Sequence, residues 1–243
     1  MTVLFISDLH LSETRPEINR VFFEFLRGAA ARAGELWILG DLFEYWAGDD
    51  DSDDPFNRTV LDAIARCARA GTRIRVMHGN RDFLMGPEFE AASGAKLVDD
   101  PYTAFIAGRT TMLTHGDALC TDDQEYQAFR RQVRAKDWQE RFLAQSLPER
   151  KQQIAALRER SETEKARKPA EIMDVNPKAV ESLLRAHAYP RLIHGHTHRP
   201  ARHEHVVDGR TCERWVLPDW YETGGVLVCD EGGCRLERLV SAR

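Results

Sequence analysis

Short apolar runs alternate with amphipathic segments along most of the chain. The runs are mostly apolar, as expected for strands buried on both faces; they cover residues 3–6, 36–39, 74–77, 111–114 and 191–193. Residues 17–33 and 59–70 instead carry apolar side chains at helical spacing. This alternation predicts a mixed α/β domain, with helices packed against a buried sheet.

The C-terminal part of the chain changes to an antiparallel pattern. Residues 202–217 surround Asp208-Gly209, which is a strong hairpin turn. Residues 225–240 surround a second turn at Gly232-Gly233. We expect these antiparallel strands to form a second sheet that packs on the first.

A charged, helix-rich insertion at residues 121–170 interrupts the strand pattern of what is otherwise one domain, residues 1–243. Between Arg130 and Lys168, twelve Lys and Arg stand against six Asp and Glu, whereas the whole chain has a net charge of −5. Apolar side chains recur there at helical intervals, namely Tyr126, Phe129, Val133, Trp138 and Phe142. They could pack the insertion on the main domain or line a lid. The basic excess fits either an exposed, salt-bridged helix face or attraction to anionic lipid.

Composition limits the classes of function. A chain of 243 residues with a modest negative charge gives no reason to expect nucleic-acid binding. No apolar run approaches the roughly 18 residues of a membrane span, and residues 1–8 lack the basic region of a signal peptide. The five Cys are scattered, which favours reduced thiols over a disulfide framework. The acidic run at residues 49–54 lacks the Gly and Glu of an EF-hand, so we expect a solvated loop.

Residues with metal-ligand chemistry follow each predicted strand. They lie in Ser7-Asp8-Leu9-His10, Gly40-Asp41, Gly79-Asn80-Arg81-Asp82, Thr114-His115-Gly116-Asp117 and His194-Gly195-His196-Thr197-His198. Open α/β sheets place their sites at the carboxyl ends of strands. A single Gly-Asp is usually a turn and a single His is often structural, but five such segments in order predict one site. Carboxylates, imidazoles and an amide suit Mn²⁺, Fe²⁺ or Zn²⁺, and two such ions can hydrolyse a phosphate ester.

The ordered motifs resemble the calcineurin-like metallophosphoesterase superfamily. The resemblance covers Asp8 to His198 and implies an αββα sandwich of the α/β (α+β) class, with the insertion as a helical lid. It implies two divalent metal ions, with Mn²⁺ as the expected ion. One would be held by Asp8, His10, Asp41 and His198, and the other by Asp41, Asn80, His115 and His196. His78 and His194 fall outside this set, and we expect them to be structural.

Arg81 stands where many relatives carry a His directly after the motif Asn. That His is a candidate proton donor to an alkoxide leaving group, whereas an Arg keeps its proton near neutral pH and clamps phosphate oxygens. The alternative is a structural pair between Arg81 and Asp82 or another acid. If Arg81 faces the site, it favours cleavage of a phosphoanhydride, because a phosphate leaving group needs no proton.

Longer strings resemble one branch of the superfamily, the UDP-2,3-diacylglucosamine diphosphatases of lipid A biosynthesis. These strings are residues 40–44, 79–84, 115–117 with 120–123, 172–176 and 193–200. The branch cleaves the pyrophosphate of UDP-2,3-diacylglucosamine to UMP and 2,3-diacylglucosamine 1-phosphate. The hypothesis that follows is attack on the α-phosphorus by water that two metal ions activate.

The branch also implies a set of substrate contacts. They are Asn80, Arg81, Asp123, Ser161, Lys168 and His196, with Arg81 and His196 as the catalytic residues that stabilise phosphoryl charge. Lys165 stands where some members have Asn, so its contact with substrate is an open question. Ser161 and the two lysines could equally be solvated helix surface.

The branch further implies a monomeric, cytoplasmic enzyme in peripheral contact with the cytoplasmic face of the inner membrane. Its partner would be a glycolipid nucleotide and not a nucleic acid. One alternative is a soluble metallophosphoesterase acting on nucleotides or phosphoproteins, although a small polar substrate needs no lipid lid. Another is a metal-free scaffold of the same fold, which would not need seven residues of metal-ligand type.

Overall fold

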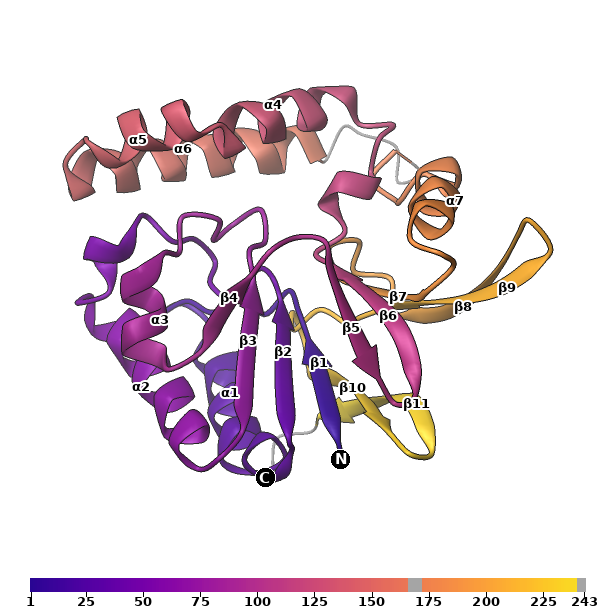
Figure 1. Cartoon of the computed structure of the whole chain (residues 1–243). Coiled ribbons are helices and arrows are strands. Elements are labelled where there is room, and N and C mark those ends of the chain that lie inside the picture. Colours follow the sequence, from indigo (N-terminus) through magenta and orange to yellow (C-terminus); the bar gives the residue numbers. More distant parts are fainter. Residues whose placement is uncertain (166–171, 240–243) are drawn as a thin grey trace.

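Two β-sheets pack face to face between two layers of helix in the computed structural model, which describes residues 1–165 and 172–239 (Figure 1). The first sheet has the order β11-β10-β1-β2-β3-β4 and the second has the order β5-β6-β7-β9-β8. Strands of the first sheet are β1 (Val3–Ile6), β2 (Glu35–Leu39), β3 (Arg73–Met77), β4 (Lys96–Val98), β10 (Gly224–Asp230) and β11 (Gly233–Leu239). Strands of the second are β5 (Tyr102–Ile106), β6 (Arg109–Thr114), β7 (Arg191–His194), β8 (Ala201–Val207) and β9 (Arg210–Val216).

Strand β1 is apolar at every position because both of its faces are covered. Leu4 and Ile6 pack into the cluster beneath the helices, whereas Val3 and Phe5 pack into a second cluster between the two sheets. Successive side chains of a strand point to opposite faces, so a strand covered on both sides must be apolar throughout. The sheets therefore share one core, and the predicted αββα sandwich is confirmed.

Helices cover the outer face of each sheet. Those on the first sheet are α1 (Pro16–Arg27), α2 (Pro55–Arg69) and α3 (Pro87–Ser93), and α7 (Pro177–Ala186) packs on the second sheet. Helix α2 begins four residues before the predicted start, because the Asp54 carboxylate caps the helix by accepting from the Phe56 and Asn57 amides. Pro55 then occupies the first turn, where a missing N–H costs nothing.

The described part of the insertion, residues 121–165, forms three helices, α4 (Gln124–Arg134), α5 (Lys136–Leu143) and α6 (Leu147–Lys165). They run across the top of the molecule in Figure 1, above the carboxyl ends of β1, β2 and β3. Much of the insertion's positive charge pairs with the main domain: Arg130 binds Asp117, and Arg158 binds Glu44. Arg130 and Arg158 thus fit neither an exposed helix face nor a lipid-attracting surface. Lys136 and Arg141 do form exposed i,i+4 pairs with Glu140 and Asp137, as expected for a salt-bridged helix face. In the described part of the chain, no helix is long and apolar enough to cross a membrane.

The acidic run does not form the solvated loop that we expected. Asp51 is buried and binds Lys151 at 2.7 Å, and Asp50 pairs with the buried Arg150. Asp49 accepts from the backbone amides of Gly86 and Glu88. The run looks solvated in sequence because its partners, α6 and the segment before α3, lie far along the chain. Its carboxylates instead fasten the insertion to the main domain.

The C-terminal hairpin also differs from the prediction. The 202–217 hairpin, β8 and β9, joins the second sheet as expected, but β10 and β11 extend the first sheet. Strand β10 pairs antiparallel with β1, with Val3 opposite Cys229. Nearly all of β10 is buried, so it belongs inside a sheet rather than at a solvated edge. The sheet that a strand joins depends on partners that a local pattern does not specify.

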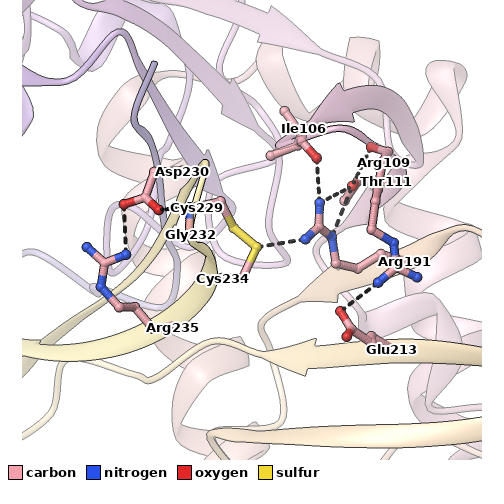
Figure 2. The surroundings of a disulfide bond; sticks show 10 residues. All are labelled: Ile106, Arg109, Thr111, Arg191, Glu213, Cys229, Asp230, Gly232, Cys234 and Arg235. Carbon is pink, nitrogen blue, oxygen red and sulfur yellow. Dashed lines mark hydrogen bonds and ion pairs between the residues drawn. A yellow bond between two sulfur atoms is a disulfide. The ribbon is translucent and has the colours of Figure 1, made fainter.

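Two of the cysteines are paired, contrary to the expectation of five reduced thiols. Cys229 and Cys234 lie directly opposite each other in the β10–β11 hairpin and form a disulfide, shown in Figure 2. The turn register brings the two Cα atoms within 4.2 Å. Arg191 donates to the Cys234 sulfur from the neighbouring sheet. The other three, Cys67, Cys120 and Cys212, are buried free thiols.

Candidate metal and phosphate site

The seven side chains predicted as metal ligands meet at the carboxyl ends of β1, β2, β3, β6 and β7. They are Asp8, His10, Asp41, Asn80, His115, His196 and His198. Backbone hydrogen bonds hold the first two of these loops together beyond the strands, because the Leu9 and His10 amides both donate to the Asp41 carbonyl. Asp8, His10, Asp41 and Asn80 thus follow strands of the first sheet, and His115, His196 and His198 follow strands of the second, so the packing of the two sheets brings the ligands together.

Asp41 occupies the centre of this group. Its Oδ2 atom lies 3.8 Å from His10 Nε2 on one side and 3.8 Å from His115 Nε2 on the other. Its Oδ1 atom accepts a hydrogen bond of 2.8 Å from the Arg81 amide. A carboxylate that faces two imidazoles is placed to bridge two cations.

The remaining ligands fall on either side of Asp41. His198 Nε2 lies 3.4 Å from Asp8 Oδ1, and His115 Nε2 lies 3.1 Å from the Asn80 amide oxygen. The His196 ring centre is 5.0 Å from that of His115. Two groups have ligand atoms within 4.8 Å of one another, and they are Asp8, His10 and His198, and Asp8, Asp41 and His115.

These residues fit a pair of divalent cations. His10 is almost fully buried, yet neither of its ring nitrogens has a hydrogen-bond partner in the described part of the chain. Leaving such atoms unpaired in a protein interior is costly unless something else binds them. The donor set of carboxylates, imidazoles and one amide, with no thiolate, is the set that Mn²⁺, Fe²⁺ and Zn²⁺ accept.

The backbone at these ligands is strained. Asp8, His10 and Asp41 have φ values of 55°, 51° and 54°, and His196 and His198 have φ values of 69° and 54°. This left-handed region is uncommon for L-residues, although Asp and His adopt it more often than most, and each residue held there costs of order 1–3 kcal/mol. The surrounding structure must therefore hold these turns in place, and this directs the ligand side chains toward one another.

Asp82 provides much of that restraint. Its side chain is fully buried and accepts from the amides of Gly79, Leu42 and Asp41 at 2.8, 2.7 and 3.3 Å. Among the described residues Asp82 forms no ion pair with the Arg81 guanidinium, and its oxygens accept from backbone amides instead; a pair between Arg81 and another acid stays an alternative. Gly79 is required here because a Cβ atom would lie 2.1 Å from Asp41 Oδ1.

The electrostatics of the buried site favour a positive partner. Burial raises the pKa of Asp41 to about 7; His115 opposes this rise, and Asp82 and Asp8 add to it. Burial alone would lower the pKa of His115, but Asp41 and Asp8 raise it to about 9. A proton on His115 thus compensates the carboxylates in the metal-free protein. Divalent cations binding here would displace that proton.

Tyr126 and Asp117 border the site from the side of the insertion. The Tyr126 hydroxyl donates to Asp117 Oδ2 at 2.9 Å, and its ring stacks on His196. Asp117 also pairs with Arg130 of α4 at 2.8 Å. Burial, and then the charge of His115, lower the pKa of His196 to about 3, so this imidazole stays neutral near pH 7. From the sequence, Tyr126 was expected only in an apolar stripe, and no role was predicted for Asp117.

Two further carboxylates, Glu44 and Asp219, were also missed. Glu44 lies beside His10, and Asp219 lies 3.2 Å from His198 Nδ1. His78 and His194 are structural, as expected. His78 Nε2 bonds the Met85 carbonyl, and buried His194 bonds the Gly195 carbonyl and Arg214.

One cavity of about 720 Å³ extends from the ligand cluster to the insertion. Five of the predicted substrate contacts line it, namely Asn80, Arg81, Asp123, Ser161 and His196. The side chain of Lys165, and Lys168 as a whole, lie outside the described residues. The apolar stripe lines the same cavity, with Trp138 and Phe142 stacked 4.8 Å apart and Phe83 opposite them. The cavity is therefore polar at the ligand cluster and apolar beneath the insertion.

Comparison with known proteins agrees with this geometry. A UDP-2,3-diacylglucosamine hydrolase of Aromatoleum aromaticum is 54% identical over 233 residues, which is 96% of this chain and 95% of the relative. The protein of the same name from Chromohalobacter salexigens is 47% identical over 241 residues, 98% of each chain. The one from Chromobacterium violaceum is 48% identical over 237 residues, 97% of this chain and 98% of the relative. The family model for calcineurin-like phosphoesterases matches residues 1–200, and the chain belongs to this family.

Proposed function

We propose that this protein hydrolyses the pyrophosphate bond of UDP-2,3-diacylglucosamine to UMP and 2,3-diacylglucosamine 1-phosphate, a step in lipid A biosynthesis. The observation that carries the proposal is the two-part cavity, which joins a dimetal-type ligand cluster to an apolar region formed with the insertion. Relatives that cover nearly the whole chain carry the name of this hydrolase. The substrate has the same two parts, a pyrophosphate and two acyl chains.

The insertion acts in this proposal as a lid over the substrate. Each methylene removed from water contributes about 0.8 kcal/mol. An acyl chain lying along Phe83, Trp138 and Phe142 therefore supplies much of the affinity, and it places the pyrophosphate at the polar end. A nucleotide or phosphoprotein would leave this apolar region exposed to water, which disfavours the alternative of a soluble phosphoesterase acting on such substrates.

The chain's own residues bind and orient the phosphates. When bound at Asp8, His10, Asp41, Asn80, His115, His196 and His198, divalent ions would supply Lewis acidity and a water of lowered pKa. Arg81 lines the cavity beside Asn80, where its guanidinium can hold phosphoryl oxygens. Neutral His196 can donate a hydrogen bond to the same oxygens while it is stacked on Tyr126. No side chain must protonate the departing sugar phosphate, because phosphate leaves as an anion.

The direct test is incubation of the purified protein with UDP-2,3-diacylglucosamine and Mn²⁺, with and without a chelator. We expect UMP to form only with metal, and metal analysis identifies the ion. Bis-nucleotides and cyclic nucleotides are assayed beside it, and faster turnover of either would favour the alternative. Reaction in ¹⁸O-water is expected to label UMP, because attack is proposed at the α-phosphorus. Label in the sugar phosphate would contradict that point of attack.

We also propose that the protein is a cytoplasmic monomer that contacts the inner membrane peripherally, where its glycolipid substrate lies. Phe129, Leu143 and Leu157 of the insertion are about 40% exposed and can enter a lipid interface. Because Arg130, Lys151 and Arg158 are paired with the main domain, binding to vesicles should depend only weakly on salt. Vesicle sedimentation at low and high salt, and size-exclusion chromatography with light scattering, test these points.

A further inference from the structure

Glu44 lies between a metal-type ligand and the insertion. Its Oε2 atom is 3.8 Å from His10 Nδ1, and its Oε1 atom pairs with the Arg158 guanidinium of α6. The Glu44 side chain is only 14% exposed. Its backbone amide donates to the Leu11 carbonyl at 3.0 Å, so the segment that carries Glu44 is fixed to the loop that carries His10.

His10 needs an acceptor at Nδ1. Its Nε2 atom faces Asp41, so a cation bound there leaves the ring proton on Nδ1. That nitrogen is buried and has no hydrogen-bond partner in the described residues. The nearest carboxylate is that of Glu44, and a small rotation of its side chain would close the gap. Imidazoles that bind metals ordinarily donate their second N–H to a carboxylate, a carbonyl or water, which fixes the ring.

His198, on the other side of the same predicted cation, offers an internal comparison. Its Nδ1 atom lies 3.2 Å from Asp219, which follows β9. Among the residues that the structure describes, Asp219 forms no ion pair with the insertion, whereas Glu44 forms one with Arg158. The Nδ1 atoms of His10 and His198 thus each face a carboxylate. Only one of these carboxylates, that of Glu44, also binds the insertion.

We propose that Glu44 is a positioning residue that couples the docking of helix α6 to cation binding at His10. The inference depends on the proposed metal site and adds a link between that site and the lid. Arg158 holds one carboxylate oxygen, so the other faces His10. Coupling of this kind is reciprocal: docking of α6 favours the cation, and the cation stabilises docking of α6. The lid that receives the acyl chains would then also respond to whether the metal site is filled.

A double-mutant cycle on metal affinity tests the coupling. Mn²⁺ binding is followed by EPR for the wild type, Glu44→Gln, Arg158→Ala and the double variant, without substrate. Glu44→Gln should weaken Mn²⁺ binding about tenfold, as is typical when a partner of a metal-binding imidazole is lost. Arg158→Ala also removes a positive charge. The loss of this charge should change Mn²⁺ affinity by a similar factor in the wild type and in Glu44→Gln. We expect the change in the Kd for Mn²⁺ of the double variant to differ from the product of the two single changes by about threefold or more.

Asp219→Asn is the matched control. It should also weaken Mn²⁺ binding about tenfold, but its effect should add to that of Arg158→Ala. Hydrogen exchange of α6 is the second measurement. Saturating Mn²⁺ should slow amide exchange in residues 147–165 of the wild type and of Asp219→Asn, but not of Glu44→Gln.

Three outcomes would overturn the inference. An additive Glu44–Arg158 cycle, or Mn²⁺-dependent protection of α6 that persists in Glu44→Gln, would refute the coupling and leave the proposed function intact. Absence of Mn²⁺ binding to the wild type would refute the metal site, and the coupling with it. Mn²⁺ binding to the wild type therefore distinguishes failure of the proposed metal site from failure of the coupling between that site and α6.

Discussion

Replacing Asp82 with Ala should both unfold the protein more easily and disorder the metal ligands. The carboxylate accepts from the amides of Gly79, Leu42 and Asp41 in a fully buried position. Alanine leaves these three donors and the Phe43 amide, 3.4 Å from Asp82 Oδ2, without a partner. Each unpaired buried donor costs about 1–3 kcal/mol, which gives roughly 4–12 kcal/mol for the four. Relief of the charge repulsion between Asp82 and Asp41 offsets a part of this loss.

Urea unfolding in EDTA measures the change without a contribution from metal binding. Since domains are stable by only about 5–15 kcal/mol, a loss of this size should shift the midpoint strongly. Asp82→Asn serves as the graded control, because its amide keeps one acceptor oxygen but turns an N–H toward the other amides. Asp82→Asn should lower the free energy of unfolding by about half as much as Asp82→Ala. A free energy of unfolding for Asp82→Ala within about 1 kcal/mol of the wild type would refute this account of how the loops are held.

Three other predictions concern the site and the lid. His115→Ala should weaken Mn²⁺ binding and lower turnover by more than the roughly 100-fold that loss of an outer partner of a metal ligand can cost. His187→Ala, at the exposed end of α7, should change neither; Mn²⁺ affinity and UMP release decide. Phe129→Ala, which shortens a cavity-lining side chain, should raise KM for the long-chain substrate about tenfold, equivalent to two buried methylenes of ~0.8 kcal/mol each. Phe105→Ala on β5, which is exposed and lies outside the cavity lining and the insertion, is its control, and an equal loss with a short-chain analogue would contradict the lid. Mn²⁺ at a hundred times its Kd should stabilise the protein by about 2.7 kcal/mol, and EDTA should lower Tm by roughly 5–10 °C.

Local patterns in the sequence were enough to predict the elements and the cluster of candidate ligands. Strand β1 is apolar at every position because both its faces are covered, and helix α2 shows its apolar face at helical spacing. The ligand segments after β1, β2 and β3 could be assigned to one site because carboxyl ends of parallel strands share an edge of the sheet. The segments after β6 and β7 join them only because the second sheet packs on the first. Each of these inferences needs only residues that are neighbours in the sequence, plus one general rule of sheet geometry.

Contacts between distant segments decided everything else. The acidic run at residues 49–54 acquires partners only when α6 and the segment before α3 fold beside it. Hairpin β10–β11 joins the first sheet, and so pairs with β1, at more than 200 residues' separation. Glu44 looks like an ordinary surface acid until the fold places it between His10 and Arg158. The hydrophobic pattern of a helix or strand predicts which of its sides is buried, but it does not predict which distant element covers that side. The function of a carboxylate such as Glu44 depends on that distant partner.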